Sequence, residues 1–464
     1  MPKRWVLLYL APMGSRFFSS VVYAGVIASI SACGMRVPAG SAAQLALKGA
    51  PMWGHVDMRS AWLQVGVTGQ GKVTCEVWTL DSVGVPREFQ PSEVNARFGT
   101  AKFELYDLEP GTRYAALLRD GTRVLSDTLR IQTQVLWDYR MDPPPFKLLA
   151  GSCAFLNEPE YDRPGRAYGG EYGIFTSMAA EQPDMMLWLG DNIYLREVDF
   201  GSITGYRHRY DQARALPELK ALWSACPHYA IWDDHDYGPN DCDGAWIHKD
   251  WALDAFKAYW PNPGYGVADR VEGIATAFRF SDVDFFLLDN RWNRVNAGTK
   301  TGTPQVLGSD QIDWLIASLR TSRAPFKLIA VGGQVLSDAA IYENLANYPS
   351  ERNALLERIA AEGIRGVVFL TGDRHNTELT RVELPGGLVV YDLTLSPLTS
   401  TAHDHTEEPN TLRVPETMVG ERNYGVLTFS GPRKDRVLGI QVKKVDGAIL
   451  WERTIRATEL ASPR

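Results

Sequence analysis

Short stretches in which apolar and polar residues alternate dominate residues 52 to 135. Alternation with a period of two predicts strands that bury one face. Turn signals such as Pro110-Gly111 separate the stretches. Many short strands bounded by turns favour a β-sandwich, so we expect a small all-β domain over residues 51–140. The alternating segments are 60–67, 73–79, 101–108 and 114–119.

The pattern changes after the run Asp142-Pro143-Pro144-Pro145, which marks a domain boundary. Continuous apolar runs then alternate with amphipathic helical stretches, as is typical of strands that helices cover on both faces. We therefore expect residues 145–455 to form a layered α/β domain, with further strands at its end. The predicted strands are 146–150, 185–189, 228–232, 283–288, 326–331 and 366–370, and the predicted helices are 172–181, 250–259, 309–320 and 350–362.

The first 33 residues have the features of an export signal rather than of a fold. Positive charges precede an apolar stretch over residues 17–30, which is shorter than the about 20 residues that a membrane span needs. The stretch ends in Ile30-Ser31-Ala32-Cys33, which resembles a bacterial lipoprotein cleavage box. We expect Cys33 to carry a lipid, and the protein to be exported and membrane-anchored in the periplasm or at the cell surface. A plain secretory signal or an uncleaved anchor stays open, and residues 34–50 are predicted to be a tether.

Composition and charge agree with two soluble domains. A chain of 464 residues is long for one domain, and 45% apolar residues are enough for a sizeable core. The net charge of −7 argues against a nucleic-acid-binding surface. Cys226 and Cys242 would either form a disulfide or be two separate buried thiols. No Cys-x-x-Cys pair is present, so a thiolate zinc site is not indicated.

Four predicted strands of the α/β domain are followed directly by residues that can ligate a metal ion. Each segment alone would fit a turn, a buried thiol or a helix cap. Functional groups gather outside the carboxyl ends of strands in open α/β sheets, and a shared cation would offset the cost of burying them. Their coincidence therefore predicts a metal site. The segments are Gly151-Ser152-Cys153, Gly190-Asp191-Asn192-Ile193-Tyr194, Trp232-Asp233-Asp234-His235-Asp236 and Thr371-Gly372-Asp373-Arg374-His375.

The mixture of ligand types indicates the metal and the chemistry. Carboxylate, amide and imidazole groups suit hard ions, whereas a thiolate and a phenolate suit ferric iron. Asp191 is placed to bridge two ions, which would hold a hydroxide nucleophile and stabilise a phosphoryl transfer. His235 is expected to stabilise developing charge or to protonate the leaving oxygen, with Asp236 orienting it. No Gly-x-Ser-x-Gly elbow is present to supply a serine nucleophile.

Four motifs follow the predicted sandwich in the order Gly-Ser-Cys, Leu-Gly-Asp-x-Ile-Tyr, Trp-Asp-Asp-His-Asp and Thr-Gly-Asp-x-His. With this set of motifs, the chain resembles the PhoD-like alkaline phosphatases, which belong to the calcineurin-like metallophosphoesterases. The resemblance implies a four-layer αββα domain, hydrolysis of phosphomonoesters or phosphodiesters, and an iron ion (Fe3+) next to a calcium ion (Ca2+). The passage 108–114 resembles a fibronectin type III domain. By motif, the candidates for the iron side are Cys153, Asp191, Tyr194, Asp373 and His375, and those for the calcium side are Asp191, Asp234, Asn240 and Asp373.

Three departures from the family pattern leave the substrate open. The family commonly has tyrosine where this chain has Asn192, and glutamate where it has Leu195 and Asp236. These changes leave the ligand set largely intact.

Residues that would contact the substrate are less clearly marked. Arg166, His208 and Arg374 are candidates because cationic side chains bind phosphate oxygens, and Arg374 is predicted to be catalytic. Gln334, in Gly332-Gly333-Gln334-Val335, is a weaker candidate for a substrate contact. A surface charge or a strand-end turn would explain these residues equally well.

The sequence thus predicts a phosphoric ester hydrolase that acts on small phosphoesters. A phosphodiesterase, either phospholipase D-like or acting on nucleotides, is the alternative among enzymes. A metal-bearing cell-surface module without catalysis is the alternative outside them. The oligomeric state stays open.

Overall fold

The computed structural model describes residues 43–460, apart from residues 83 and 268–269. The predicted export signal, with Cys33, and most of the predicted tether lie outside the described residues. The last part of that tether is already folded, because β1 (Ala46–Leu47) pairs with β3 (Ala61–Thr68) and Leu45 is buried. The prediction therefore placed the end of the tether too late along the chain.

Two sheets form the amino-terminal sandwich. In the first sheet, β2 (Met52–Val56) pairs with β3, and the order is β1, β3, β7 (Thr100–Leu105) and β6 (Glu93–Asn95). In the second, the order is β10 (Leu129–Gln132), β8 (Arg113–Asp120), β4 (Val73–Thr79) and β5 (Arg87–Phe89), with β9 (Arg123–Val124) on β8. Leu63 and Phe103 of the first sheet share one core with Cys75 and Leu118 of the second. The sandwich prediction is confirmed.

The α/β domain contains, over the described residues, two six-stranded sheets. The first has the order β13 (His228–Ile231), β12 (Met185–Leu189), β11 (Phe146–Gly151), β20 (Asn423–Ser430), β21 (Val437–Lys444) and β22 (Ile449–Arg456). The second has the order β14 (Thr276–Phe280), β15 (Val283–Leu287), β16 (Phe326–Ala330), β17 (Val367–Thr371), β19 (Leu388–Thr394) and β18 (Glu378–Leu384). Strands β11 to β13 are parallel, as are β15, β16, β17 and β19. Each sheet thus brings several strand ends to one edge.

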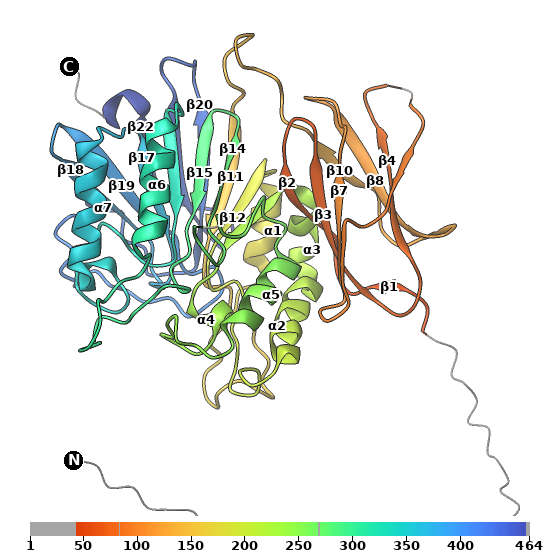
Figure 1. The fold of residues 1–464 in the computed structure, drawn as a ribbon, viewed down its shortest axis with the longest axis horizontal. Coiled ribbons are helices and arrows are strands. Elements are labelled where there is room, and N and C mark those ends of the chain that lie inside the picture. Colours follow the sequence, from red (N-terminus) through yellow and green to blue (C-terminus); the bar gives the residue numbers. More distant parts are fainter. Residues whose placement is uncertain (1–42, 83, 268–269, 461–464) are drawn as a thin grey trace, which may run out of the picture. The chain divides into compact units, whose positions relative to one another are not determined.

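Helices cover the outer face of each sheet (Figure 1). Val368 and Leu370 of β17 point into the core between the sheets, whereas Val367 and Phe369 pack in a second core with the helices α6 (Ser309–Thr321) and α7 (Pro349–Ala361). On the other side, Trp188 of β12 stacks against Trp223 of α3 (Lys220–Ala225), with ring centroids 5.1 Å apart. Helices α1 (Gly173–Ala180), α2 (Ile203–Ala215) and α5 (Lys249–Tyr259) lie on the same side (Figure 1). The four-layer αββα arrangement is confirmed.

The structure also bears on the disulfide pairing left open by the sequence and on membrane-spanning helices. Cys226 and Cys242 are both free thiols, so the disulfide considered for them is not formed. Within residues 43–460 as described, no helix has the length and the apolar character needed to cross a bilayer.

The sandwich contacts the α/β domain closely at Gly54. The backbone N–H of His55 donates to the carbonyl oxygen of Pro261 at 3.0 Å. A Cβ atom on Gly54 would lie 2.2 Å from Cγ and 2.6 Å from the carbonyl oxygen of Pro261. Only glycine therefore allows this approach without a shift of either domain.

The substitution Gly54→Ala tests this contact. We expect it to lower the free energy of unfolding by about 1–3 kcal/mol, because the added methyl group overpacks the contact. The matched control is Gly173→Ala in α1, where an added Cβ would meet no atom within 4 Å. Denaturant unfolding would measure both variants, and equal stability of Gly54→Ala and the unchanged protein would contradict the contact.

Candidate metal centre

Strand ends from both sheets meet at one place. Gly372, which follows β17, donates its backbone N–H to the carbonyl oxygen of Gly332 at 2.6 Å. A Cβ atom on Gly372 would lie 2.6 Å from the carbonyl oxygen of Leu189, at the end of β12. A Cβ atom on Gly190 would lie 2.8 Å from Cβ of Asp233, which follows β13. Glycines at these positions bring the loops after four strands into contact.

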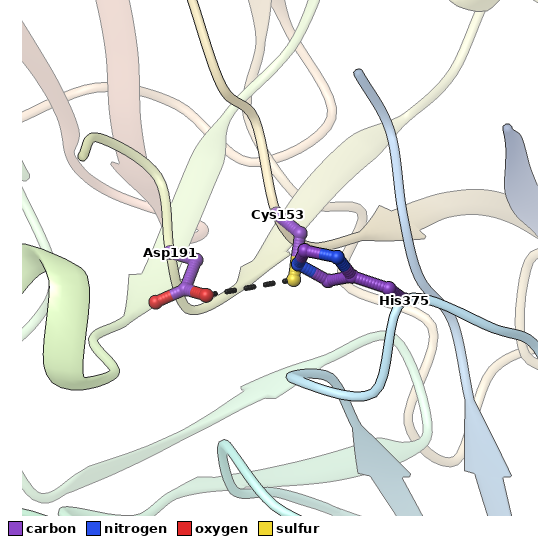
Figure 2. Close-up of side chains that lie close together, drawn as sticks. All are labelled: Cys153, Asp191 and His375. Carbon is purple, nitrogen blue, oxygen red and sulfur yellow. Dashed lines mark hydrogen bonds between the residues drawn. The ribbon is translucent and has the colours of Figure 1, made fainter. Parts of the chain in front are cut away.

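A thiol, a carboxylate and an imidazole form the first group at this edge (Figure 2). Sγ of Cys153 lies 3.6 Å from Oδ2 of Asp191, and one ligand atom of His375 lies within 4.8 Å of both. All three side chains are buried. The phenol of Tyr194 joins them, because its hydroxyl donates to Oδ2 of Asp191 at 3.1 Å and lies 3.3 Å from Nε2 of His375.

The backbone at these positions is strained. Cys153, Asp191, Asp373 and His375 all have positive φ angles, of 60°, 51°, 68° and 55°. This region of φ costs about 1–3 kcal/mol for a residue other than glycine, and such strain gathers at functional sites. Four strained residues at neighbouring strand ends indicate that the positions of these side chains are maintained at a cost in local stability.

A second group shares Asp191. It consists of Asp191, Asp234 and His235, where Asp234 begins the short helix α4 (Asp234–Tyr237). Oδ1 of Asp191 accepts the backbone N–H of His235 at 3.3 Å, while its Oδ2 faces Cys153. Oδ2 of Asp234 accepts from the backbone N–H of Asp241 at 2.7 Å, and its buried Oδ1 has no hydrogen-bond partner among the described residues. Asp191 thus has one oxygen toward each group.

Three residues that the sequence reasoning missed support the second group. Glu343 lies with Asp233 and Asp234 in a third acidic group, and the buried guanidinium of Arg291 donates to both Asp233 and Glu343. Arg294 is also paired with Glu343, at 2.6 Å. Arg291 follows β15 in the run Asp289-Asn290-Arg291. Its position after a strand end is therefore the sequence feature from which it could have been predicted.

Burial and like charge control the protonation of the first group. Burial, and then the neighbouring Asp234 carboxylate, raise the pKa of Asp191 well above its usual range. Burial also raises the pKa of the Cys153 thiol and of the Tyr194 phenol. A cation would favour the charged form of each group and would satisfy the free oxygen of Asp234. Sulfur, oxygen and nitrogen donors with an unsatisfied carboxylate oxygen therefore fit a metal ion.

Three further side chains hold the first group in place, and the sequence reasoning missed them. Ser396 donates to Sγ of Cys153 at 3.1 Å, and Ser400 donates to the hydroxyl of Tyr194 at 3.0 Å. The hydroxyl of Tyr168 lies 3.2 Å from Nδ1 of His375. A partner on the second ring nitrogen orients a ligating histidine. These residues lie on loops without a run of ligand types, so the sequence held no signal for them.

The structure places three predicted residues in supporting roles. Asp236 was expected to orient His235, but its carboxylate accepts the backbone N–H groups of Asn192 and Asp233, at 3.1 and 3.0 Å. Gln334, predicted to contact substrate, is buried and donates to Glu378 and Thr394. Arg374, predicted to be catalytic, is buried and donates to Gln334 at 2.8 Å and to Glu408 at 2.5 Å. Their hydrogen-bonding capacity is used inside the protein.

Two of the other predicted residues line a cavity of about 740 Å³ beside the centre. Arg166 and Asn240 line it together with Tyr194 and His235, and both are exposed. Asp373 follows β17 and is partly exposed. His208 does not line the cavity, because it lies on α2 and pairs with Glu158 at 2.9 Å.

Comparisons with known proteins show the family and the fold of this chain. The family described as PhoD-like phosphatase matches residues 148–431. Alkaline phosphatase D of Bacillus subtilis (strain 168) is 26% identical over 254 residues, which are 44% of this chain and 43% of that protein. The alignment therefore spans less than half of that relative.

Two solved structures show the same fold. A structure of PhoD matches with a TM-score of 0.71 at 17% identity, over 89% of this chain and 91% of that chain. The purple acid phosphatase PPD1 from seeds of yellow lupin (Lupinus luteus) matches with a TM-score of 0.66 at 12% identity, over 88% of this chain and 74% of that chain. Both cover the sandwich as well as the α/β domain, and they confirm the fold.

The raised pKa of Asp191 predicts how the metal-free protein responds to pH. A carboxyl whose pKa is higher in the folded than in the unfolded state contributes most to stability at low pH, and that contribution is lost as the pH rises through the folded-state pKa. After chelation, we expect Asp191→Asn to melt a few degrees higher than the unchanged protein at pH 7, with a smaller difference at pH 5.

Thermal unfolding followed by circular dichroism would measure this effect. Bound metal stabilises only the state that binds it, so the order of the two proteins should reverse when metal is restored. A metal-free Asp191→Asn protein that is less stable than the unchanged protein at pH 7 would contradict the account.

Proposed function

Because this chain belongs to the PhoD-like phosphatases, a family of phosphoric ester hydrolases, we propose that it hydrolyses phosphoesters at the centre described above. The matched residues 148–431 contain all the candidate ligands. The observation that carries the proposal is the position of Asp191, whose Oδ1 faces the group with Asp234 and His235 and whose Oδ2 faces Cys153.

The proposed centre would hold two metal ions. One ion would be held by Cys153, Tyr194 and His375, and the other by Asp234 and Asn240. Asp191 would contact both ions, and Asp373 would lie beside them. A thiolate and a phenolate favour Fe3+ on the first side, and oxygen donors favour Ca2+ on the second. When bound, the ions would supply the charge that activates water and stabilises the phosphoryl oxygens.

The protein's own groups position the reacting atoms. Asp191 is held by the Tyr194 hydroxyl and by the backbone N–H of His235, so its two oxygens keep their directions. The ring of His235 lies 4.3 Å from that of Tyr194 and lines the cavity. We assign to it the stabilisation of charge on the leaving oxygen through a ring N–H, a role worth about 10²–10⁴-fold in rate.

The protein is also proposed to be an exported lipoprotein that is anchored to a membrane through Cys33. The support is the charged start, the apolar stretch over residues 17–30 and the cleavage box before Cys33. The substrate would then be a small phosphoester outside the cytoplasm.

Metal analysis together with activity assays tests the central proposal. We expect Asp191→Ala and Cys153→Ala to lose metal and activity, because each removes a ligand. His235→Gln should keep its metal while kcat falls about 10²–10⁴-fold. Cys75→Ala is the matched control, because this buried thiol lies in the sandwich core.

The assays would use one phosphomonoester and one phosphodiester, which also separates the phosphatase from the phosphodiesterase alternative. Full metal content and activity in both ligand variants would overturn the proposed centre. A metal-replete protein that hydrolyses neither ester would instead favour a surface module without catalysis.

Cell fractionation tests the anchor. In a bacterial host, the unchanged protein should be recovered with the membranes, and Cys33→Ala should move to the soluble exported fraction or keep its uncleaved signal. Incorporation of a labelled fatty acid into Cys33→Ala at the level of the unchanged protein would contradict lipidation at Cys33.

A further inference from the structure

We propose that the cavity beside the centre binds the organic group of the ester and selects large planar leaving groups over small ones. We call this cavity the leaving-group cleft; loops 155–168 and 194–200 form its walls, and His235 and Asn240 complete its lining. The inference rests on the proposed function, because it assigns the substrate class of the same site.

The cleft opens directly onto the proposed centre. Tyr194 and His235 belong both to the cavity lining and to the cluster around Asp191. In a hydrolysed ester, the phosphoryl group must lie against the metal-holding side chains. The organic group attached to it then extends into the cleft, on the side where His235 would meet the leaving oxygen.

The size of the cleft exceeds what a small alcohol needs. Its volume of about 740 Å³ lies within the range of about 300–1,000 Å³ that is usual for sites that enclose drug-sized ligands. A short alkyl group would leave most of this volume to water, whereas a fused ring system would displace that water from the aromatic part of walls that also carry polar and charged side chains.

Partly exposed aromatic side chains line the cleft. Tyr161 and Tyr168 are 38% and 39% exposed. Phe155 and Phe200 add apolar surface to the same walls. Aromatic rings favour stacked or edge contacts with other flat groups, so these walls suit a planar ligand.

The walls of the cleft are preformed. The guanidinium of Arg196 lies 4.0 Å from the ring centroid of Phe155 and donates to the carbonyl oxygen of Leu156 at 2.7 Å. Asn157 and Gly169 exchange two hydrogen bonds of 2.9 Å each, which ties the two ends of the first wall loop together. A cavity that is already ordered loses little conformational entropy when it binds a ligand.

Two esters that differ only in ring size provide the test. The phenols released from 2-naphthyl phosphate and phenyl phosphate have similar acidity, so the ratio of their kcat/KM values reports recognition of the second ring. We expect the metal-replete full chain to favour 2-naphthyl phosphate at least about tenfold, since even one methylene in an apolar pocket is worth about 10–200-fold.

Variants locate the preference in the cleft. Tyr161→Ala should reduce the ratio to about two or less, and Tyr161→Phe should keep it, because the ring face remains. Tyr106→Ala is the matched control, since this tyrosine of the sandwich is 56% exposed and lies outside the cleft. An unchanged ratio in Tyr161→Ala would overturn the assignment of the cleft.

Inhibition by the product alcohols gives a second measurement that needs no variant. With phenyl phosphate as substrate, 2-naphthol should inhibit at a concentration at least about tenfold lower than phenol does. Equal rates for the two esters together with equal inhibition would overturn the inference and leave the proposed function intact. If the metal-replete protein hydrolyses neither ester, the proposed function fails and the inference falls with it.

Discussion

The burial of negative and ionisable groups at the meeting point of two sheets is the constraint on which the rest of this structure depends. Asp191, Asp234, Cys153 and Tyr194 are removed from water within a few ångströms of one another. Burial raises the pKa of Asp191, Cys153 and Tyr194, so their charged forms need a partner. Arg291 donates to Asp233 and Glu343, and its guanidinium lies 3.7 Å from Oδ1 of Asp234, but no ion pair to Asp191 forms among the described residues.

The fold supplies the geometry that this constraint requires. Parallel strands end at one edge, and Gly190, Gly332 and Gly372 let their loops approach to distances that a side chain would forbid. Cys153, Asp191, Asp373 and His375 adopt positive φ angles where these loops meet. The two packed sheets, with helices on their outer faces, are rigid enough to hold this strained backbone in place. The walls of the leaving-group cleft are also held by hydrogen bonds, so the substrate side of the centre is ordered as well.

Patterns of apolar residues predicted the sandwich, the layered α/β domain and the edge at which the ligands gather, because period and strand ends are local properties of the chain. The sequence could not show what depends on contacts between distant segments. Gln334 and Arg374 look like free polar groups in the sequence, yet they satisfy each other inside the protein. Ser396, Tyr168 and Glu343 support the centre from loops that carry no motif. The predicted tether extended too far along the chain because the two residues of β1 are too few to show an alternation of apolar and polar positions.

A crystal structure of the metal-replete protein with anomalous scattering measured at the absorption edges of its metals is the most direct test of the central claim. The account predicts two ions, one in contact with Cys153, Asp191 and His375 and the other with Asp191 and Asp234. A single ion that does not touch Asp191, or ions bound away from these strand ends in an active protein, would contradict it.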